Sequence, residues 1–118
     1  MAITEYVEIG GKKRPVRFDY MTIYLWSKVT KKRIEALIYV ASLSFDEVVD
    51  LCRAGLYRGT QVEKPVEEIT IEQVCEWLTE RPKAQVEIMK IFYESAEKLW
   101  GDPDLGKDQT GETGNLQK

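Results

Sequence analysis

The stretch from Ser44 to Leu56 carries the strongest local folding signal in this chain. The Ser44 hydroxyl can accept a hydrogen bond from the first turn of a helix, and the Glu47 side chain can reach back to the Ser44 backbone N–H. Gly55 and Gly59 then bracket the expected end of this helix. Apolar residues recur between these signals at helical spacing and predict one buried stripe: Phe45, Val48, Val49, Leu51, Cys52 and Leu56. A helix with one such stripe needs other elements to pack against.

The N-terminal segment predicts a β-hairpin. Residues 3–9 partly alternate apolar and polar side chains, as in a half-buried strand, and the Gly-Gly pair that follows can adopt the positive φ angles of a tight turn. The chain should return through residues 13–18, where Pro15 indicates an edge strand because proline cannot donate to a ladder. A two-stranded hairpin is marginally stable in water, so we expect it to lie on helices.

Two helical patterns follow the hairpin. Asp19 can cap a strongly apolar helix over Tyr20–Val29, which we expect at the centre of the core, with Trp26 buried. One-face spacing predicts a second helix over Ile34–Ala41. A single helix that continues through Thr30 fits the pattern as well, so this boundary stays open.

The second half of the chain predicts two more helices. Thr70 and Gln73 repeat the capping-box pattern and open a short helix that ends near Glu80. Pro82 suits the first turn of the next helix, so it marks a bend. The closing helix is expected over Lys83–Trp100, and its apolar residues are spread too widely for one face against one neighbour.

Together these patterns predict a mainly α fold, in which a small N-terminal β-hairpin packs on a bundle of about five helices. The chain of 118 residues suits a single helical domain over residues 1–100. Residues 101–118 hold few apolar side chains, so their burial could not offset the entropy lost on ordering. We expect them to form a disordered polar tail.

The residue types argue against catalysis. The chain has no histidine, which excludes Ser-His-Asp and Cys-His arrangements and every histidine-based metal site. Cys52 and Cys75 each lie on the apolar face of a predicted helix, as expected of reduced core thiols. Glu72 and Glu76 lie one helical turn apart and are explained by a solvated helix face. We therefore expect no enzyme activity, no cofactor and no metal.

Four residues are candidates for binding a partner: Trp77, Tyr93, Leu99 and Trp100. Tryptophan and tyrosine are favoured anchors of protein interfaces. The alternative is that these side chains cover the edge of a small core. An exposed apolar surface of this kind can also bind a second copy of the chain, so a homo-oligomer is a further expectation.

Charge and hydropathy narrow the classes of partner. Seventeen basic and twenty acidic residues give a net charge of -3, so nucleic acid is an unexpected partner. A helix-turn-helix over Thr70–Trp100, and hence a small DNA-binding regulator, is the alternative, although its first helix is acidic. The sequence shows neither a signal peptide nor a run of about 20 apolar residues, which a membrane span requires. We expect no membrane association.

The order of elements resembles a known family. A strand pair, Glu-Tyr-Val-Glu-Ile-Gly-Gly-Lys-Lys-Arg-Pro-Val, leads into an apolar helix, Met-Thr-Ile-Tyr-Leu-Trp. After these come Ser-Phe-Asp-Glu-Val-Val-Asp-Leu-Cys-Arg-Ala-Gly-Leu, a Thr-Ile-Glu-Gln-Val helix, a long closing helix and a polar tail. Over residues 4–100 this layout is similar to that of the tail assembly chaperones of long-tailed bacteriophages and the related tail-cluster proteins of gene transfer agents.

The resemblance implies a function without catalysis. Such a chaperone is a small protein of the bacterial host cytoplasm that binds tape measure and tail tube proteins during tail assembly and is absent from the finished tail. Some members of the family are also made in a longer form by ribosomal frameshifting. A structural tail or head-completion protein is a further alternative, and the resemblance implies no catalytic residues.

Overall fold

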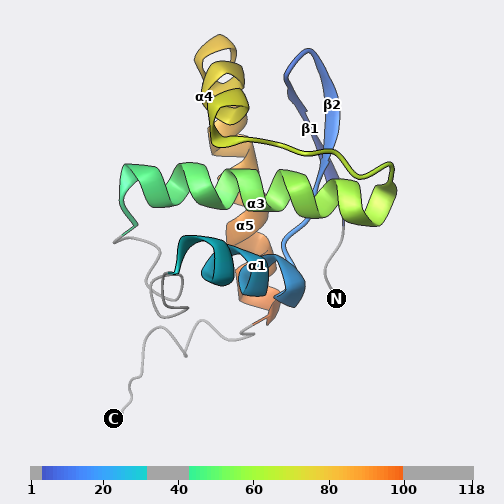
Figure 1. Cartoon of the computed structure of the whole chain (residues 1–118), viewed down its shortest axis with the longest axis vertical. Helices are drawn as coiled ribbons and strands as arrows, with labels where there is room; N and C mark the ends of the chain where they lie inside the picture. The colour runs from blue at the N-terminus through green and yellow to red at the C-terminus, as the bar shows by residue number, and fades with distance from the viewer. Residues whose placement is uncertain (1–3, 32–42, 100–118) are drawn as a thin grey trace.

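The computed structural model describes residues 4–31 and 43–99 (Figure 1). Within these residues it contains a two-stranded hairpin and four helices: β1 (Glu5–Ile9), β2 (Lys12–Val16), α1 (Tyr20–Thr30), α3 (Phe45–Glu63), α4 (Ile71–Glu80) and α5 (Lys83–Leu99). The prediction of a mainly helical fold with an N-terminal hairpin is confirmed. The described part holds four helices where about five were expected over the whole chain, and the helix expected over Ile34–Ala41 and the tail from residue 101 lie outside it.

The hairpin forms as its sequence predicts. Gly10 and Gly11 turn the chain with φ angles of 66° and 83°, and β1 pairs with β2 so that Val7 lies opposite Arg14. Val7 and Ile9 share one face and are buried. That face packs on helices, because β2 contacts α3 and β1 contacts α5. The expectation that the hairpin lies on helices is therefore confirmed.

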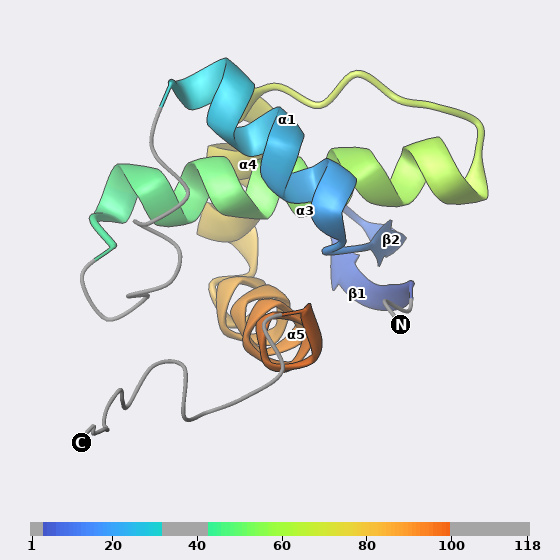
Figure 2. The ribbon, with the colours of Figure 1, turned by 90° about the horizontal axis from the view of Figure 1, so that it is seen from below.

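Helix α3 is the central element of the fold. The other three helices and β2 all contact it, and Figure 2 shows α3 lying between α1 and α5. Its start agrees with the prediction: the Ser44 hydroxyl accepts a hydrogen bond from the Glu47 N–H, and the Glu47 carboxylate accepts one from the Ser44 N–H. This capping box satisfies backbone donors that have no partner within the helix.

The predicted end of α3 is wrong. The helix runs through Gly55 and Gly59 and ends at Glu63. A Cβ atom added to Gly59 would lie 2.1 Å from the Pro15 carbonyl oxygen, and one added to Gly55 would lie 2.5 Å from the Phe18 ring. The two glycines are therefore packing residues, because only a residue without a side chain lets the return strand approach Gly59, and the Phe18 ring approach Gly55, this closely. The Arg17 backbone N–H also donates to the Gly55 carbonyl oxygen at 3.0 Å.

The core lies where the hairpin, α1, α3 and α5 meet. The Phe18 and Phe92 rings pack edge to face, with centroids 5.3 Å apart. Trp26 is 1% exposed, which confirms its prediction as a core residue. The largest fully buried side chains of the core include Phe18, Trp26, Leu51, Leu56, Ile88 and Phe92.

Helix α1 is not at the centre of the core, contrary to the prediction. Only Thr22, Ile23 and Trp26 are buried among its residues, because α1 packs mainly on α3 and turns its remaining sides outward. The structure also shows whether this helix continues through Thr30. Helix α1 stops at Thr30, and Lys31 adopts a left-handed conformation with its N–H donating to the Ser27 carbonyl oxygen.

Two residues of the predicted apolar stripes are also exposed. Phe45 lies in the first turn of α3, which extends past the helices packed on it, and 76% of its surface is accessible (Figure 1). Cys75 is exposed because α4 is short and buries only Val74. Cys52 is buried, as expected of a core thiol.

Candidate interaction surfaces

The outward side of α1 exposes four large side chains, and the Lys28 amine lies among them and donates to the Tyr24 hydroxyl at 3.4 Å. Tyr20, Met21, Tyr24 and Val29 are between 45% and 62% exposed, and we call these four residues the α1 outer face. Their positions follow from the helical repeat, because Ile23 and Trp26 take the opposite side against α3. Large apolar groups gathered on one exposed face are typical of protein-binding surfaces.

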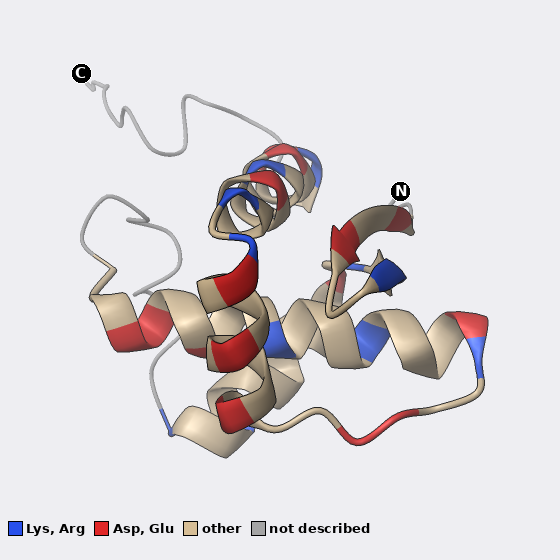
Figure 3. Cartoon of the chain, turned by 90° about the horizontal axis from the view of Figure 1, so that it is seen from above, with Lys and Arg blue, Asp and Glu red and all other residues tan. Residues whose placement is uncertain are grey.

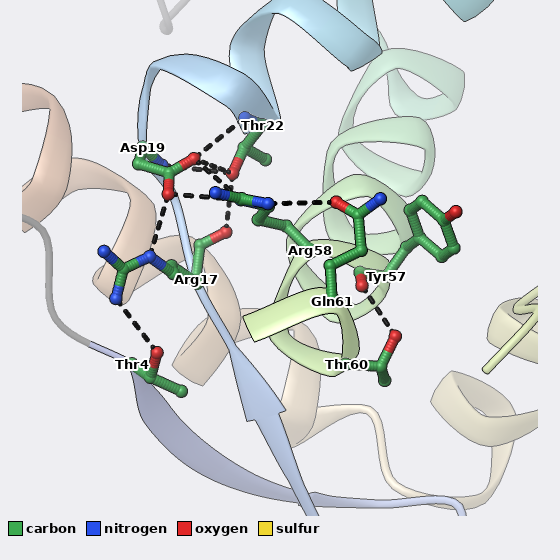
Figure 4. A network of polar contacts seen from close by, with 8 residues as sticks. All are labelled: Thr4, Arg17, Asp19, Thr22, Tyr57, Arg58, Thr60 and Gln61. Carbon is green, nitrogen blue, oxygen red and sulfur yellow. Dashed lines mark hydrogen bonds and ion pairs between the residues drawn. The ribbon is translucent and has the colours of Figure 1, made fainter. Parts of the chain in front are cut away.

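A polar network holds the start of α1 in place (Figure 4). The Asp19 carboxylate accepts hydrogen bonds from the Thr22 N–H at 3.0 Å, from Arg17 Nε at 2.8 Å and from Arg58 Nε at 3.2 Å. Arg58 belongs to α3 and also donates to Gln61 at 3.2 Å. The network thus joins the hairpin exit, the α1 cap and α3, which fixes the direction in which the α1 outer face points.

The same contacts shift the titration of Asp19. Burial alone would raise the pKa of this carboxyl, but the hydrogen bonds from Arg17 and Thr22 and the charge of Arg58 outweigh it and lower the pKa to about 2. Asp19 is therefore ionised at neutral pH, and its charge-assisted hydrogen bonds strengthen the junction.

Trp77 lies against the hairpin turn. The Arg14 guanidinium stacks over its ring at 4.1 Å from the centroid, and a Cβ atom on Gly10 would lie 2.6 Å from ring atom Cε2. Arg14 is held in turn by the Ile9 carbonyl oxygen at 2.9 Å and by Glu67 at 3.1 Å. The half-buried Trp77 ring therefore packs α4 against the hairpin.

The other candidate partner-binding residues lie elsewhere. Tyr93 is 48% exposed on α5, with its ring tilted against Phe92. Leu99 is half-buried and is the last residue of α5. It lies roughly 24 Å along the helix from Lys83, the residue where α5 begins next to α4, at 1.5 Å per residue. Trp100 lies outside the described residues. The structure therefore does not gather Trp77, Tyr93 and Leu99 into one patch, and their role in binding a partner stays a prediction.

Two clefts flank α3. One, of about 210 Å³, lies beside the hairpin, where Glu67 pairs with Arg14 at 3.1 Å and with Lys12 at 3.6 Å. In the same cleft Tyr6 donates to Glu63 at 3.0 Å, and this hydrogen bond raises the pKa of Tyr6. Glu63 and Glu67 are thus engaged within this cleft, which Lys13 and Lys64 also line.

The other cleft, of about 220 Å³, lies between the start of α3 and the bend that joins α4 to α5. We call it the α3–α4 cleft. Its walls are mainly apolar and include Phe45, Val49, Cys75, Leu78 and Pro82. The exposed Phe45 ring and the exposed Cys75 thiol therefore lie at the same opening.

The thiols differ in reactivity. Burial raises the pKa of Cys52 to about 12, so its thiolate is scarce at neutral pH, whereas Cys75 is exposed. Among residues 4–31 and 43–99, no group of three or more Cys, Asp or Glu side chains is placed to hold a metal ion. Within the same ranges, no helix combines the length and apolar character needed to cross a membrane.

The bend between α4 and α5 is closed by one ion pair and a hydrogen bond to the hairpin. Arg81 binds both oxygens of Glu87, at 2.8 and 3.0 Å, and donates to the Glu8 carbonyl oxygen at 2.9 Å. The hydrogen bonds between the pair raise the pKa of Arg81 and lower that of Glu87. Helix α4 carries three glutamates and no basic residue, as Figure 3 shows. The pairing with Glu87 neutralises Arg81, and the α4 glutamates repel phosphates. The bend and α4 are therefore unfavourable for a DNA backbone, which argues against a helix-turn-helix regulator.

Comparisons of this chain with protein-family models, curated proteins and solved structures found no match. A functional assignment must therefore start from the surfaces themselves. Sequence reasoning missed the α1 outer face because it took an all-round apolar helix as a buried one. The signal was available, because the sides of Tyr20–Val29 differ little in hydrophobicity. Such a pattern also fits a helix with one face in the core and a second face for a partner.

Proposed function

We propose that this protein is a tail assembly chaperone of a bacteriophage or prophage, which binds tape measure and tail tube proteins during tail formation in the host cytoplasm and has no catalytic role. The α1 outer face is the observation that carries the proposal. The proposal also draws on the resemblance in layout between this chain and that family. The identity of the two clients comes from the resemblance alone.

The size of the α1 outer face suits a transient complex. Covering its four half-exposed side chains would contribute on the order of 1 kcal/mol each. The loss of translational and rotational freedom on association costs about 4–15 kcal/mol. The face alone therefore binds weakly, and a stable complex requires further contacts from the client. A chaperone that must release its client during assembly needs a surface of this kind.

Co-expression tests the proposal. We expect the wild-type chain to raise the soluble fraction of a tape measure or tail tube protein encoded beside it, and to co-purify with it. The double variant Tyr20→Ser, Tyr24→Ser should lose this effect with little change in melting temperature, because both side chains are exposed. The matched control Glu94→Ser, Glu97→Ser changes two exposed residues of α5 and should keep it.

Two results would count against the proposal. If neither client is solubilised or co-purified by the wild-type chain, the chaperone function fails. If the protein is instead found as a stoichiometric component of purified particles, the alternative of a structural tail or head-completion protein replaces it.

A further inference from the structure

We propose that the α3–α4 cleft is a second docking surface, which binds a basic segment of another protein through one large apolar side chain. This inference goes beyond the chaperone proposal, because it concerns different residues and specifies the chemistry of a partner segment. In Figure 1, α4 and α1 contact α3 from different sides, so the cleft and the α1 outer face are separate surfaces.

The shape and lining of the cleft define the anchor. Its volume is about 220 Å³, and an apolar cavity of about 150 Å³ can hold a benzene ring. Val49 and Leu78 form apolar walls, and the Phe45 ring stands at the opening with most of its surface exposed. An aromatic or branched aliphatic side chain entering this space would be covered by apolar groups from α3, α4 and the bend.

The charge around the cleft defines the flanks of the partner segment. Helix α4 carries Glu72 and Glu76 beside the cleft and has no basic residue. Figure 3 shows acidic residues along α4. Thr79 lines the cleft. Around the axis of α4, the helical repeat places Glu72 next to Thr79 and Glu76 next to Glu72. Lysine and arginine beside the anchor would meet complementary charge.

The α4 carboxylates are not committed to other contacts. Within the described part of the chain, no basic side chain forms an ion pair with Glu72, Glu76 or Glu80. The nearby Arg81 is bound to Glu87, and the nearby Arg53 donates to the Ile69 carbonyl oxygen at 3.1 Å. The basic residues next to the cleft therefore leave Glu72 and Glu76, the acidic rim of the cleft, available to a partner.

Cys75 offers a direct measure of occupancy. Its thiol is exposed in the wall of the cleft, whereas Cys52 is buried and has a raised pKa, so an alkylating reagent applied to the folded protein modifies Cys75 selectively. A segment bound in the cleft should slow this reaction, whereas a segment bound only to the α1 outer face should leave its rate unchanged.

The probe is an amphipathic 14-residue peptide built only from leucine and lysine. We expect a saturating amount to slow alkylation of Cys75 at least about fivefold, with weaker protection as salt screens the charges. A peptide of the same pattern with glutamate in place of lysine should give no protection. The double variant Glu72→Gln, Glu76→Gln should weaken binding of the lysine peptide about tenfold, which corresponds to 1.4 kcal/mol. The matched variant Glu94→Gln, Glu97→Gln should bind it as the wild type does.

Three outcomes would overturn the inference. Equal protection by the glutamate peptide would show apolar capture without charge selection, and unchanged binding by Glu72→Gln, Glu76→Gln would remove the role of the rim. Protection that grows with protein concentration without any peptide would mean that a second copy occupies the cleft. Because no phage protein takes part, failure here leaves the co-expression result unaffected, and the reverse also holds.

Discussion

The first turn of α3 and its C-terminal half are built in different ways. The C-terminal half contains Gly59, which lies directly against the return strand of the hairpin, Gly55, which lies against the Phe18 ring, and Arg58, which binds Asp19. The first turn carries Phe45, which is 76% exposed, at the mouth of an apolar cleft. Both parts belong to one helix and carry apolar residues at the same spacing, yet the C-terminal half is closed against its neighbours and the first turn is open.

The difference shows where the fold is fixed and where the molecule can bind. The closed half sets the position of the hairpin and of α1 through backbone contact and a charged network, so substitutions there should affect stability. The first turn carries the exposed Phe45 and contributes little to the core, so substitutions there should affect binding, whereas Val49 and Leu51 just beyond it are buried. Measurements that separate these two effects test the division directly.

The largest expected effect is that of Gly59→Ala. In an ordinary helix interior this change stabilises by about 1 kcal/mol. Here the added Cβ would lie 2.1 Å from the Pro15 carbonyl oxygen, so the strand must move away from the helix. We expect a net loss of about 3 kcal/mol or more, measured by urea unfolding.

Gly55→Ala provides the comparison, because its obstacle is the ring of Phe18 and not backbone. Shortening that side chain in the double variant Gly55→Ala, Phe18→Leu should recover part of the loss, with a coupling of at least about 0.5 kcal/mol. A stability gain from Gly59→Ala would contradict the close contact, and the closed half of α3 would then need another explanation.

Asp19→Asn should have the next largest effect. The variant keeps a group that can cap α1 but loses the charge that pairs with Arg17 and Arg58. The folded pKa is lowered from 3.8 to about 2, which corresponds to about 2 kcal/mol of stability at neutral pH. Unfolding in urea at pH 7 should show a loss of about this size.

The pH dependence gives a second measurement for the same residue. Because the folded pKa lies below the unfolded one, the wild-type advantage is present above pH 3.8 and is lost as the pH falls through 2. The two proteins should therefore become equally stable near pH 2. Glu87→Gln is the control, since the side chains of its pair with Arg81 are more exposed than Asp19, at 33% and 34% against 15%, and the pair should matter less. A difference between wild type and Asp19→Asn that does not change with pH would exclude the charge as its cause.

Much of the fold could be predicted because its signals are local. The Ser44 and Thr70 capping boxes mark where α3 and α4 begin, and the Gly-Gly turn and residue alternation define the hairpin. These features depend on residues only a few positions apart. Trp26 was also predicted correctly, because its helix is apolar enough to place one side in the core.

The errors arise where contacts between distant residues decide the outcome. Nothing near Gly59 in the sequence shows that Pro15 will lie against it, so its local context predicts a helix end. Likewise, helical spacing groups Phe45 with Leu51 but does not say how far the neighbouring helices extend. The candidate surfaces depend on these long-range arrangements, which is why the α1 outer face and the α3–α4 cleft were missed.

The smallest expected effect is that of Phe45→Ala, and it is the sharpest test of the open first turn of α3. Sequence pattern places Phe45 and Leu56 on one stripe, so on that basis both should matter to the core. Leu56 is fully buried, and Leu56→Ala should cost about 2–5 kcal/mol. Phe45→Ala should stay within about 0.5 kcal/mol, because its ring is mostly in water. Urea unfolding followed by tryptophan fluorescence measures both. Equal losses would mean that Phe45 is packed in solution, and the start of α3 would then be closed like its end, leaving no cleft for a partner.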